Sequence, residues 1–191
     1  VHKTIERLRE GKTRHDKGGV IWHTQGSGKS LTMVFLTMKM RRDPVLREYK
    51  LVFLTDRTQL DEQLTNTFRN AQGETIRHAG SVKELKDLLA TDASDIITAM
   101  VQKFQEGADD LEFPVLNTSD KIIVLADEAH RTQYGTLGVA INVALPNAPR
   151  IAFTGTPLIK TQKTTNSFGS YIDTYTIEQA VQDGATVQIL Y

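Results

Sequence analysis

The chain has 191 residues, 39% of them hydrophobic, and this length and composition suit one α/β domain with its own buried core. Lys and Arg total 23, as do Asp and Glu, so the zero formal net charge argues against a free-standing basic nucleic-acid-binding domain. The absence of cysteine excludes disulfides and a Cys-ligated metal site and suits a reducing cytoplasm, where we expect the protein. No apolar run reaches about 18 residues, so we expect no membrane span.

Short apolar runs alternate with helical patterns along the chain, which is typical of parallel βα units. We expect strands at 19–22, 50–55, 76–79, 95–100, 122–126 and 150–154. We expect helices at 29–42, at 58–68, from residue 82 onward and at 177–182, with loops at 105–120 and 160–170. The alternation predicts an α/β fold with a mostly parallel central sheet.

Two of the expected helices carry local signals. The helix at 29–42 has Leu31, Val34, Phe35 and Met38 on one face. The helix that follows Ser81 has that serine as its expected N-cap, with Glu84 at the capping-box position.

A glycine-rich loop follows the first expected strand and opens the first of these helices. It consists of Gln25, Gly26, Ser27, Gly28, Lys29 and Ser30. Glycines allow a tight turn whose N–H groups, together with the helix N-terminus, bind phosphate oxygens. In such a loop the lysine reaches the β- and γ-phosphates and the hydroxyl after it binds Mg²⁺. The sequence therefore predicts a phosphate-binding loop for a nucleotide.

The loop departs from the usual pattern at its start. That pattern has a first glycine separated by four residues from the glycine–lysine pair, and here the position is occupied by His23. Gly26 and Gly28 still flank the sharp turn, so the departure does not affect the mechanism. The alternative is a polar turn with a solvated lysine, which the preceding strand, the following helix and an acidic pair downstream make improbable.

The acidic pair directly follows the apolar run 122–126, at the carboxyl end of an expected strand. Asp127 would hold Mg²⁺, Glu128 would position and polarise the attacking water, and His130 could sense the γ-phosphate or link it to a second lobe. The alternative is a helix N-terminus whose acids interact favourably with the helix dipole. Together with the phosphate loop, the pair favours phosphoryl transfer from ATP.

These segments resemble the motifs of superfamily 2 helicases and translocases. Asp127-Glu128-Ala129-His130 resembles their motif II, and Thr154-Gly155-Thr156-Pro157 looks like their motif III. Leu54 to Leu60 is similar to motif Ia, and Thr98 to Phe104 looks like the segment that follows a DNA strand in these proteins.

A finer resemblance is to the R subunits of type I restriction enzymes. Its most specific parts are Trp22 to Ser30, which matches their phosphate loop, and the tail Tyr171 to Ile177. Thr55-Asp56-Arg57, Gln102-Lys103-Phe104 and Asp127 to Arg131 point the same way. The resemblance covers nearly the whole chain.

This resemblance implies a three-layer P-loop NTPase domain of the RecA-like type, with ATP and Mg²⁺ as cofactors. It further implies a motor that uses ATP to pull double-stranded DNA past methyltransferase and specificity subunits, while a separate nuclease domain cuts the DNA. We expect residues 1–191 to be one motor lobe of a longer chain, without the second lobe or the nuclease domain. An arginine finger from the second lobe contributes about three to five orders of magnitude in rate, so the isolated lobe should bind Mg-ATP but hydrolyse it slowly.

Polar residues after the expected strands are candidates for DNA contact and for coupling. Thr55, Arg57, Thr98, Gln102 and Lys103 carry groups that suit phosphate contact without base specificity. Thr154 and Thr156 could bond toward the acidic motif and couple nucleotide state to DNA grip. The alternatives are ordinary loop residues and helix caps for the first group, and a plain turn for the two threonines.

Two other functions remain open at this point. The chain could be a lobe of a stand-alone superfamily 2 helicase in repair or RNA work, or an ATP-responsive switch that docks partners without translocating. Flanking sequence separates the first of these from a restriction motor, and DNA stimulation of ATP turnover separates both motors from the switch.

Overall fold

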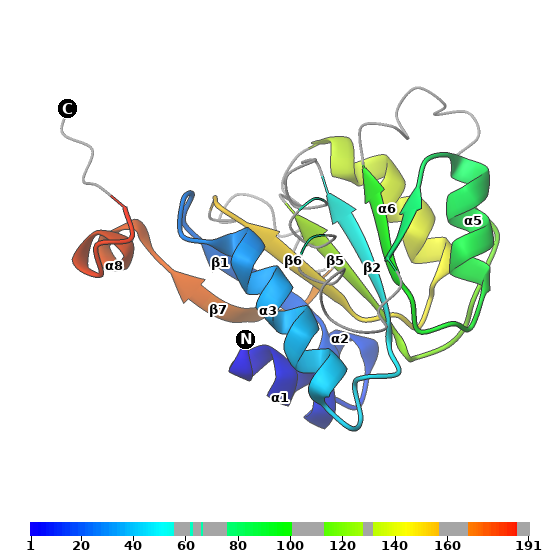
Figure 1. Ribbon diagram of the computed structural model, residues 1–191, viewed down its shortest axis with the longest axis horizontal. Coiled ribbons are helices and arrows are strands. Elements are labelled where there is room, and N and C mark those ends of the chain that lie inside the picture. The colour runs from blue at the N-terminus through cyan, green and yellow to red at the C-terminus, as the bar shows by residue number, and fades with distance from the viewer. Residues whose placement is uncertain are drawn as a thin grey trace.

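The fold is a twisted parallel sheet covered by helices on both faces, as shown in the computed structural model of the chain (Figure 1). The structure describes residues 1–55, 62, 66, 76–100, 113–127, 132–156 and 168–186. Within these ranges seven strands pair in the order β3-β4-β2-β5-β6-β1-β7. Every neighbouring pair is parallel. The predicted α/β class with a mostly parallel sheet is therefore confirmed.

The strands and helices have the following bounds. The strands are β1 (Gly19–His23), β2 (Lys50–Thr55), β3 (Ile76–Ala79), β4 (Ile96–Met100), β5 (Ile122–Asp127), β6 (Arg150–Thr154) and β7 (Tyr171–Tyr175). The helices are α1 (His2–Glu10), α2 (Arg14–Lys17), α3 (Lys29–Arg42), α5 (Val82–Ala90), α6 (Thr132–Ala144) and α8 (Ile177–Gln182).

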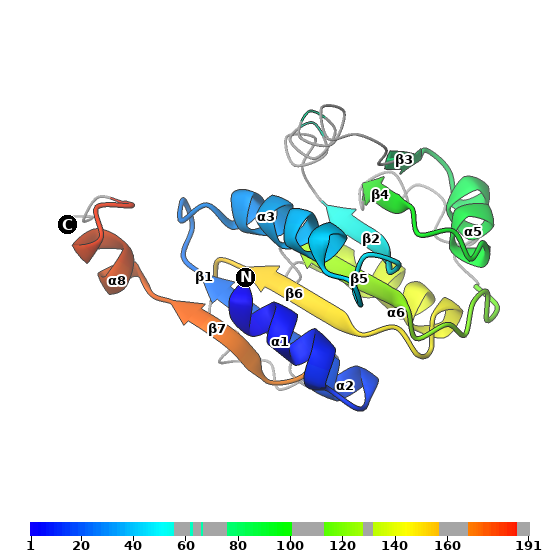
Figure 2. The same cartoon turned by 60° about the horizontal axis from the view of Figure 1, so that its bottom comes forward.

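Two apolar cores lie on opposite faces of the sheet, which makes the fold three-layered. Leu51 and Phe53 of β2 belong to the core that also contains residues of α1 and α3. Val52 and Leu54 of the same strand belong to the core formed with α5 and α6. Figure 2 shows α3 and α6 on opposite sides of the sheet. Strands buried on both faces explain the nearly continuous apolar runs in the sequence.

Most predicted elements are confirmed, several of them to the residue. The strands at 50–55, 76–79 and 150–154 and the helices at 29–42 and 177–182 have the predicted bounds, and residues 113–120 of one predicted loop form no helix or strand. Ser81 caps α5 by accepting a hydrogen bond from the Glu84 N–H. Of the helix predicted at 58–68, only Glu62 and Asn66 lie among the described residues, and both are helical.

The buried face of α3 differs from the apolar face suggested by the sequence. Of the predicted face, Val34 is buried and Met38 packs against the core, but Leu31 and Phe35 are more than half exposed. Met33, Leu36 and Met40, which lie outside that face, are fully buried. The helix carries apolar residues on all sides, so helical periodicity alone could not identify the face that packs on the sheet.

Four elements were not expected from the sequence: α1, α2, α6 and β7. α6 contains Gly135 and Gly138, which lower helix propensity, yet its residues Leu137, Ile141 and Ala144 pack in the core with α5. β7 lies at the edge of the sheet, where partly exposed residues replace the apolar run of a central strand. The formation of α6 and β7 therefore depends on tertiary packing more than on local sequence signals.

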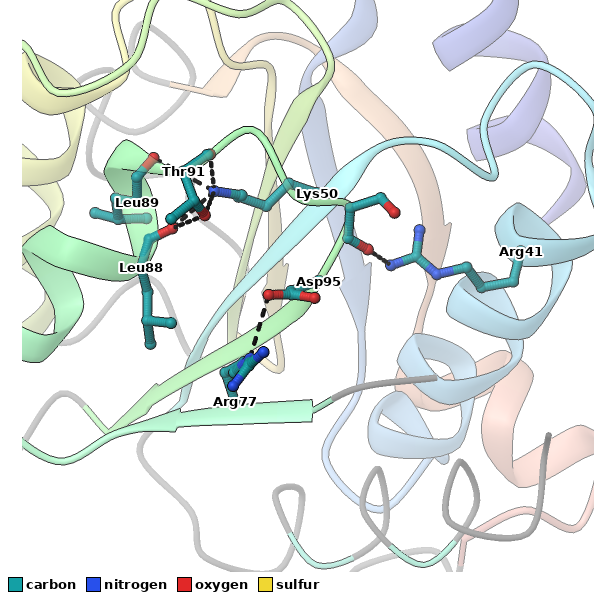
Figure 3. Close-up of polar contacts among 8 residues, drawn as sticks. Arg41, Lys50, Arg77, Leu88, Leu89, Thr91 and Asp95 are labelled. Carbon is teal, nitrogen blue, oxygen red and sulfur yellow. Dashed lines mark hydrogen bonds and ion pairs between the residues drawn. The ribbon is translucent and has the colours of Figure 1, made fainter. Parts of the chain in front are cut away.

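A polar cluster around Lys50 lies at the amino-terminal edge of the sheet (Figure 3). Lys50, only 2% exposed, donates from Nζ to the carbonyl oxygen of Leu88 at 2.7 Å, to that of Thr91, and to the Thr91 hydroxyl at 3.0 Å. These acceptors lie at the C-terminus of α5, whose last carbonyls have no partner within the helix. Burial lowers the pKa of Lys50, an effect that Asp95 and Asp92 partly oppose. Lys50 thus joins β2 to α5 by capping that helix.

Among the helices of the described ranges, none is long and apolar enough to cross a lipid bilayer.

Candidate nucleotide-binding site

The predicted site residues gather at the carboxyl edge of the sheet. In the strand register, Asp127 at the end of β5 pairs with Phe153, and Thr154 at the end of β6 pairs with Trp22. The ends of β5, β6 and β1 are therefore neighbours, and the glycine-rich loop leaves the end of β1 (Figure 1). The carboxyl ends of parallel strands are the usual location of ligand sites in α/β folds.

Two glycines give the loop its shape. Gly26 and Gly28 have φ angles of +82° and +81°, in the left-handed region that other L-residues rarely adopt. A Cβ atom built on either glycine would meet no described atom within 4 Å, so open space surrounds both positions. The glycines are therefore required by backbone conformation, and no described atom crowds either position.

The loop ends at the N-terminus of α3, for which Gly28 is the N-cap. Ser27 closes the turn by donating from its N–H and its hydroxyl to the carbonyl oxygen of Thr24, at 3.2 and 2.6 Å. The first turn of α3 contains no acidic residue, and no side chain among the described residues caps it. The N-terminal partial positive charge of this 14-residue helix therefore suits an anionic ligand.

Lys29 is 9% exposed and points back across the loop. Its Nζ lies 3.4 Å from the carbonyl oxygen of His23, the last residue of β1. It also lies 3.0 Å from the place where a Cβ of Gly155 would stand, so a side chain at position 155 would crowd the lysine. The phosphate loop and the predicted motif III segment are therefore close neighbours.

Asp127 is 5% exposed and is the last residue of β5, one residue beyond the predicted end of that strand. Next to it, the buried Thr154 hydroxyl accepts a hydrogen bond from the Thr156 N–H at 3.3 Å and contacts the Thr156 carbonyl oxygen at 3.2 Å. The threonines therefore form a compact turn beside the acidic residue. Glu128 and His130 lie outside the described residues.

The residues present fit a Mg-nucleotide. The Ser30 hydroxyl and the Asp127 carboxylate are hard oxygen donors of the kind that Mg²⁺ prefers. Lys29 supplies a positive charge, and the open loop at Gly26 and Gly28 supplies backbone N–H groups.

Of the residues predicted to contact DNA, only Thr55 and Thr98 lie among the described residues. Thr55 ends β2 and is fully buried. Thr98 lies inside β4, as the predicted strand 95–100 implies, and not after a strand end where DNA contact was expected; it is 2% exposed, with its Oγ1 2.8 Å from Nδ1 of His78. Its side chain is occupied within the sheet, because His78 of β3 is its register partner. Arg57, Gln102 and Lys103 lie outside the described residues.

Sequence reasoning missed one contact at this site. Nε2 of His23 lies 3.1 Å from Oδ2 of Asp173 in β7. The sequence of residues 171–177 indicates a resemblance to type I restriction subunits but no contact with the phosphate loop. Burial raises the pKa of the Asp173 carboxyl, but hydrogen bonds from Lys3 and His23 outweigh burial and hold the pKa below its usual value. No local signal links two residues 150 positions apart.

Comparison with known proteins agrees with this geometry. The family model described as SWI2/SNF2 ATPase matches residues 1–191. A putative type I restriction enzyme MjaIXP endonuclease subunit from Methanocaldococcus jannaschii is 43% identical over all of this chain and 18% of its own length. The type I restriction enzyme HindI endonuclease subunit from Haemophilus influenzae is 40% identical over 91% of this chain and 18% of its own length. The chain therefore spans about a fifth of the length of these relatives.

Solved structures support the fold. The UvsW helicase from bacteriophage T4 matches with a TM-score of 0.55 at 14% identity, over 90% of this chain and 58% of that protein. The Hef helicase domain from Pyrococcus furiosus has the same TM-score at 18% identity, over 91% of this chain and 38% of that one. The predicted RecA-like architecture and the resemblance to type I restriction subunits are thus confirmed. The chain belongs to the SWI2/SNF2 ATPase family.

Proposed function

We propose that this chain is the ATP-binding lobe of the DNA-translocating motor of a type I restriction endonuclease. The observation that carries the proposal is the meeting of three segments at one edge of the sheet. These are the phosphate loop, the end of β5 at Asp127, and the turn at Gly155, which lies so close to Lys29 that a side chain at position 155 would crowd it. ATP-driven motors need such an arrangement, because a turn that senses the phosphate loop can relay the nucleotide state.

The chemistry divides among the loop and strand-end residues. Backbone N–H groups of the loop and the Lys29 ammonium would bind the β- and γ-phosphates. Ser30 and Asp127 would hold Mg²⁺, which when bound neutralises charge that develops on the phosphate oxygens. Glu128 would orient the attacking water, and His130 would sense the γ-phosphate. The side chains of this lobe would bind and position the nucleotide, and a second lobe would complete the transition-state charge stabilisation.

DNA contact is proposed for segments that leave the same edge. Thr55 and Met100 are partners in the register of β2 and β4, so the chain segments that carry Arg57, Gln102 and Lys103 follow neighbouring strand ends. Cationic and amide groups at such positions suit the sugar-phosphate backbone and carry no base specificity. Thr154 and Thr156 would couple this surface to the nucleotide through the turn that they form.

The partners are proposed because the relatives are named as subunits of type I restriction enzymes. We infer that the complete protein works on double-stranded DNA with a methyltransferase subunit and a specificity subunit, and that another domain cuts the DNA. Target recognition would then belong to the specificity subunit.

Affinity capture tests this proposal. The complete protein would be tagged in its own host and its companions identified by mass spectrometry. Recovery of an adenine methyltransferase and a DNA-specificity subunit is the expected result. Capture of the protein alone, or with repair or RNA-processing proteins, would contradict the restriction motor and support a stand-alone helicase.

A further inference from the structure

His23 occupies the position where a phosphate loop usually begins with glycine. Its imidazole contacts β7, a strand that is distant in sequence but pairs with β1 in the sheet. Its Nε2 lies 3.1 Å from Oδ2 of Asp173, and the two side chains are 14% and 33% exposed. The pair therefore lies mostly away from solvent at the point where β1 passes into the loop.

A β-bulge brings the two residues to the same face of the sheet. Val20 pairs with Tyr171, but the next residue of β1, Ile21, pairs with Asp173, so Ile172 is the extra residue. Without the bulge, Asp173 would stand opposite Trp22, and the alternation of side chains would turn it to the other face. Bulges that redirect a side chain in this way are frequent beside functional sites.

Two further contacts fix the same junction. The N–H of Thr24, which joins β1 to the loop, donates to the carbonyl oxygen of Tyr175 at 3.0 Å. The Tyr175 ring packs edge-on against the His23 ring, with centroids 5.8 Å apart and planes at 67°. Backbone and side-chain contacts from β7 thus converge on two consecutive residues of β1 and the loop.

The other side of His23 faces the phosphate-binding lysine. The carbonyl oxygen of His23 lies 3.4 Å from Nζ of Lys29, so a shift of the His23 backbone changes the surroundings of that ammonium. The imidazole on one side and the carbonyl on the other connect β7 to Lys29 through a single residue.

We propose that His23 is a positioning residue whose contact with Asp173 holds the start of the phosphate loop in its nucleotide-binding shape. A glycine at this position would leave the loop entrance free to vary, whereas the imidazole ties it to β7. This proposal rests on the proposed function, because it concerns the affinity of the same loop for Mg-ATP.

The matched control comes from the other partner of Asp173. Lys3 of α1 donates to Oδ1 of the same carboxylate, and its side chain is 69% exposed. Lys3→Ala removes charge next to Asp173 without touching His23. Asp173→Asn keeps the size of the side chain while removing the carboxylate charge. It therefore tests the same contact even if the His23→Ala variant fails to fold.

The experiment measures the equilibrium dissociation constant of a fluorescent ATP analogue with Mg²⁺ in the complete protein, together with its melting temperature. His23→Ala and Asp173→Asn should each weaken binding about three- to tenfold, the equivalent of about one ordinary hydrogen bond. The double variant should be no weaker than the weaker single variant, because both remove one contact. Lys3→Ala should stay within about twofold of wild type, as for an exposed ion pair. His23→Gln, which keeps an N–H donor, should recover part of the affinity.

The outcomes separate this proposal from the function on which it rests. Wild-type affinity in folded His23→Ala and Asp173→Asn, whatever their melting temperatures, would show that the pair only packs and would overturn the proposal. Additive losses in the double variant would overturn it too. If instead Lys29→Ala binds the analogue as tightly as wild type, the phosphate loop is not the site and the proposed function itself fails.

Discussion

The Lys29 ammonium lies 3.4 Å from the carbonyl oxygen of His23, so the two ends of the phosphate loop meet across its turn. The Gly155 turn, which follows the neighbouring strand β6, lies close to the same ammonium. Movement of the Lys29 ammonium on phosphate binding would therefore affect the ends of both β1 and β6.

Gly28→Ala should weaken Mg-ATP binding and lower stability by about 1–2 kcal/mol, because alanine resists the left-handed conformation. Its φ is +81° and a Cβ there would meet no described atom, so strain and not a clash is the cause. Gly184 is the matched control, since its φ is +69° and its surroundings are equally open, but it follows α8. Gly184→Ala should lose similar stability, measured by chemical denaturation, and keep full affinity. Equal affinity losses in both variants would contradict a local effect on the loop.

Asp127→Asn should reduce the dependence of ATP binding on Mg²⁺. Wild type should bind ATP more tightly with Mg²⁺ than with EDTA, and the variant should lose about tenfold or more of that ratio when a metal ligand is impaired. Calorimetric titration in the two buffers measures the ratio. Asp95→Asn, at the opposite edge of the sheet where Asp95 pairs with Arg77, should leave the ratio unchanged. An unaltered ratio in Asp127→Asn would remove this residue from the metal site.

These site residues were predictable because their signals are local. Gly26, Gly28 and Lys29 are neighbours in sequence, and Asp127 directly follows an apolar run that predicts a buried strand. The contact between His23 and Asp173 was not predictable, since it depends on β7 pairing with β1 and on a bulge at Ile172. The packing face of α3 was not predictable either, because its exposed leucine and phenylalanine are as apolar as the residues that are buried.

Lys50→Met should destabilise the fold by about 2–4 kcal/mol, because the carbonyl groups of Leu88 and Thr91 lose a buried charged donor. The site lies at the other end of the strands, so ATP affinity should not change. Lys121→Met is the control, as Lys121 is 57% exposed and pairs with the exposed Glu48, and it should cost less than about 0.5 kcal/mol. Urea denaturation measures both, and equal costs would argue against the capping role of Lys50.

The stability contributed by Asp173 should depend on pH in the acidic range. Its pKa in the folded protein lies below the ordinary value of 3.8, so the unfolded chain takes up the proton first as the pH falls. The contribution is therefore complete above that ordinary value and is lost as the pH falls through the folded pKa. Asp173→Asn should melt below wild type near neutral pH, and the gap should close in acid. A gap that stays constant or widens as the pH falls would contradict the ion-pair geometry.

The central claim is that this lobe drives a DNA motor, and ATP turnover by the complete protein with its companion subunits tests it most directly. The rate would be measured with and without long double-stranded DNA that carries the recognition site, for wild type and Lys29→Ala. We predict that DNA raises the wild-type rate severalfold and that Lys29→Ala shows almost no turnover in either condition. A wild-type rate that ignores DNA, or a Lys29→Ala rate equal to wild type, would contradict the account.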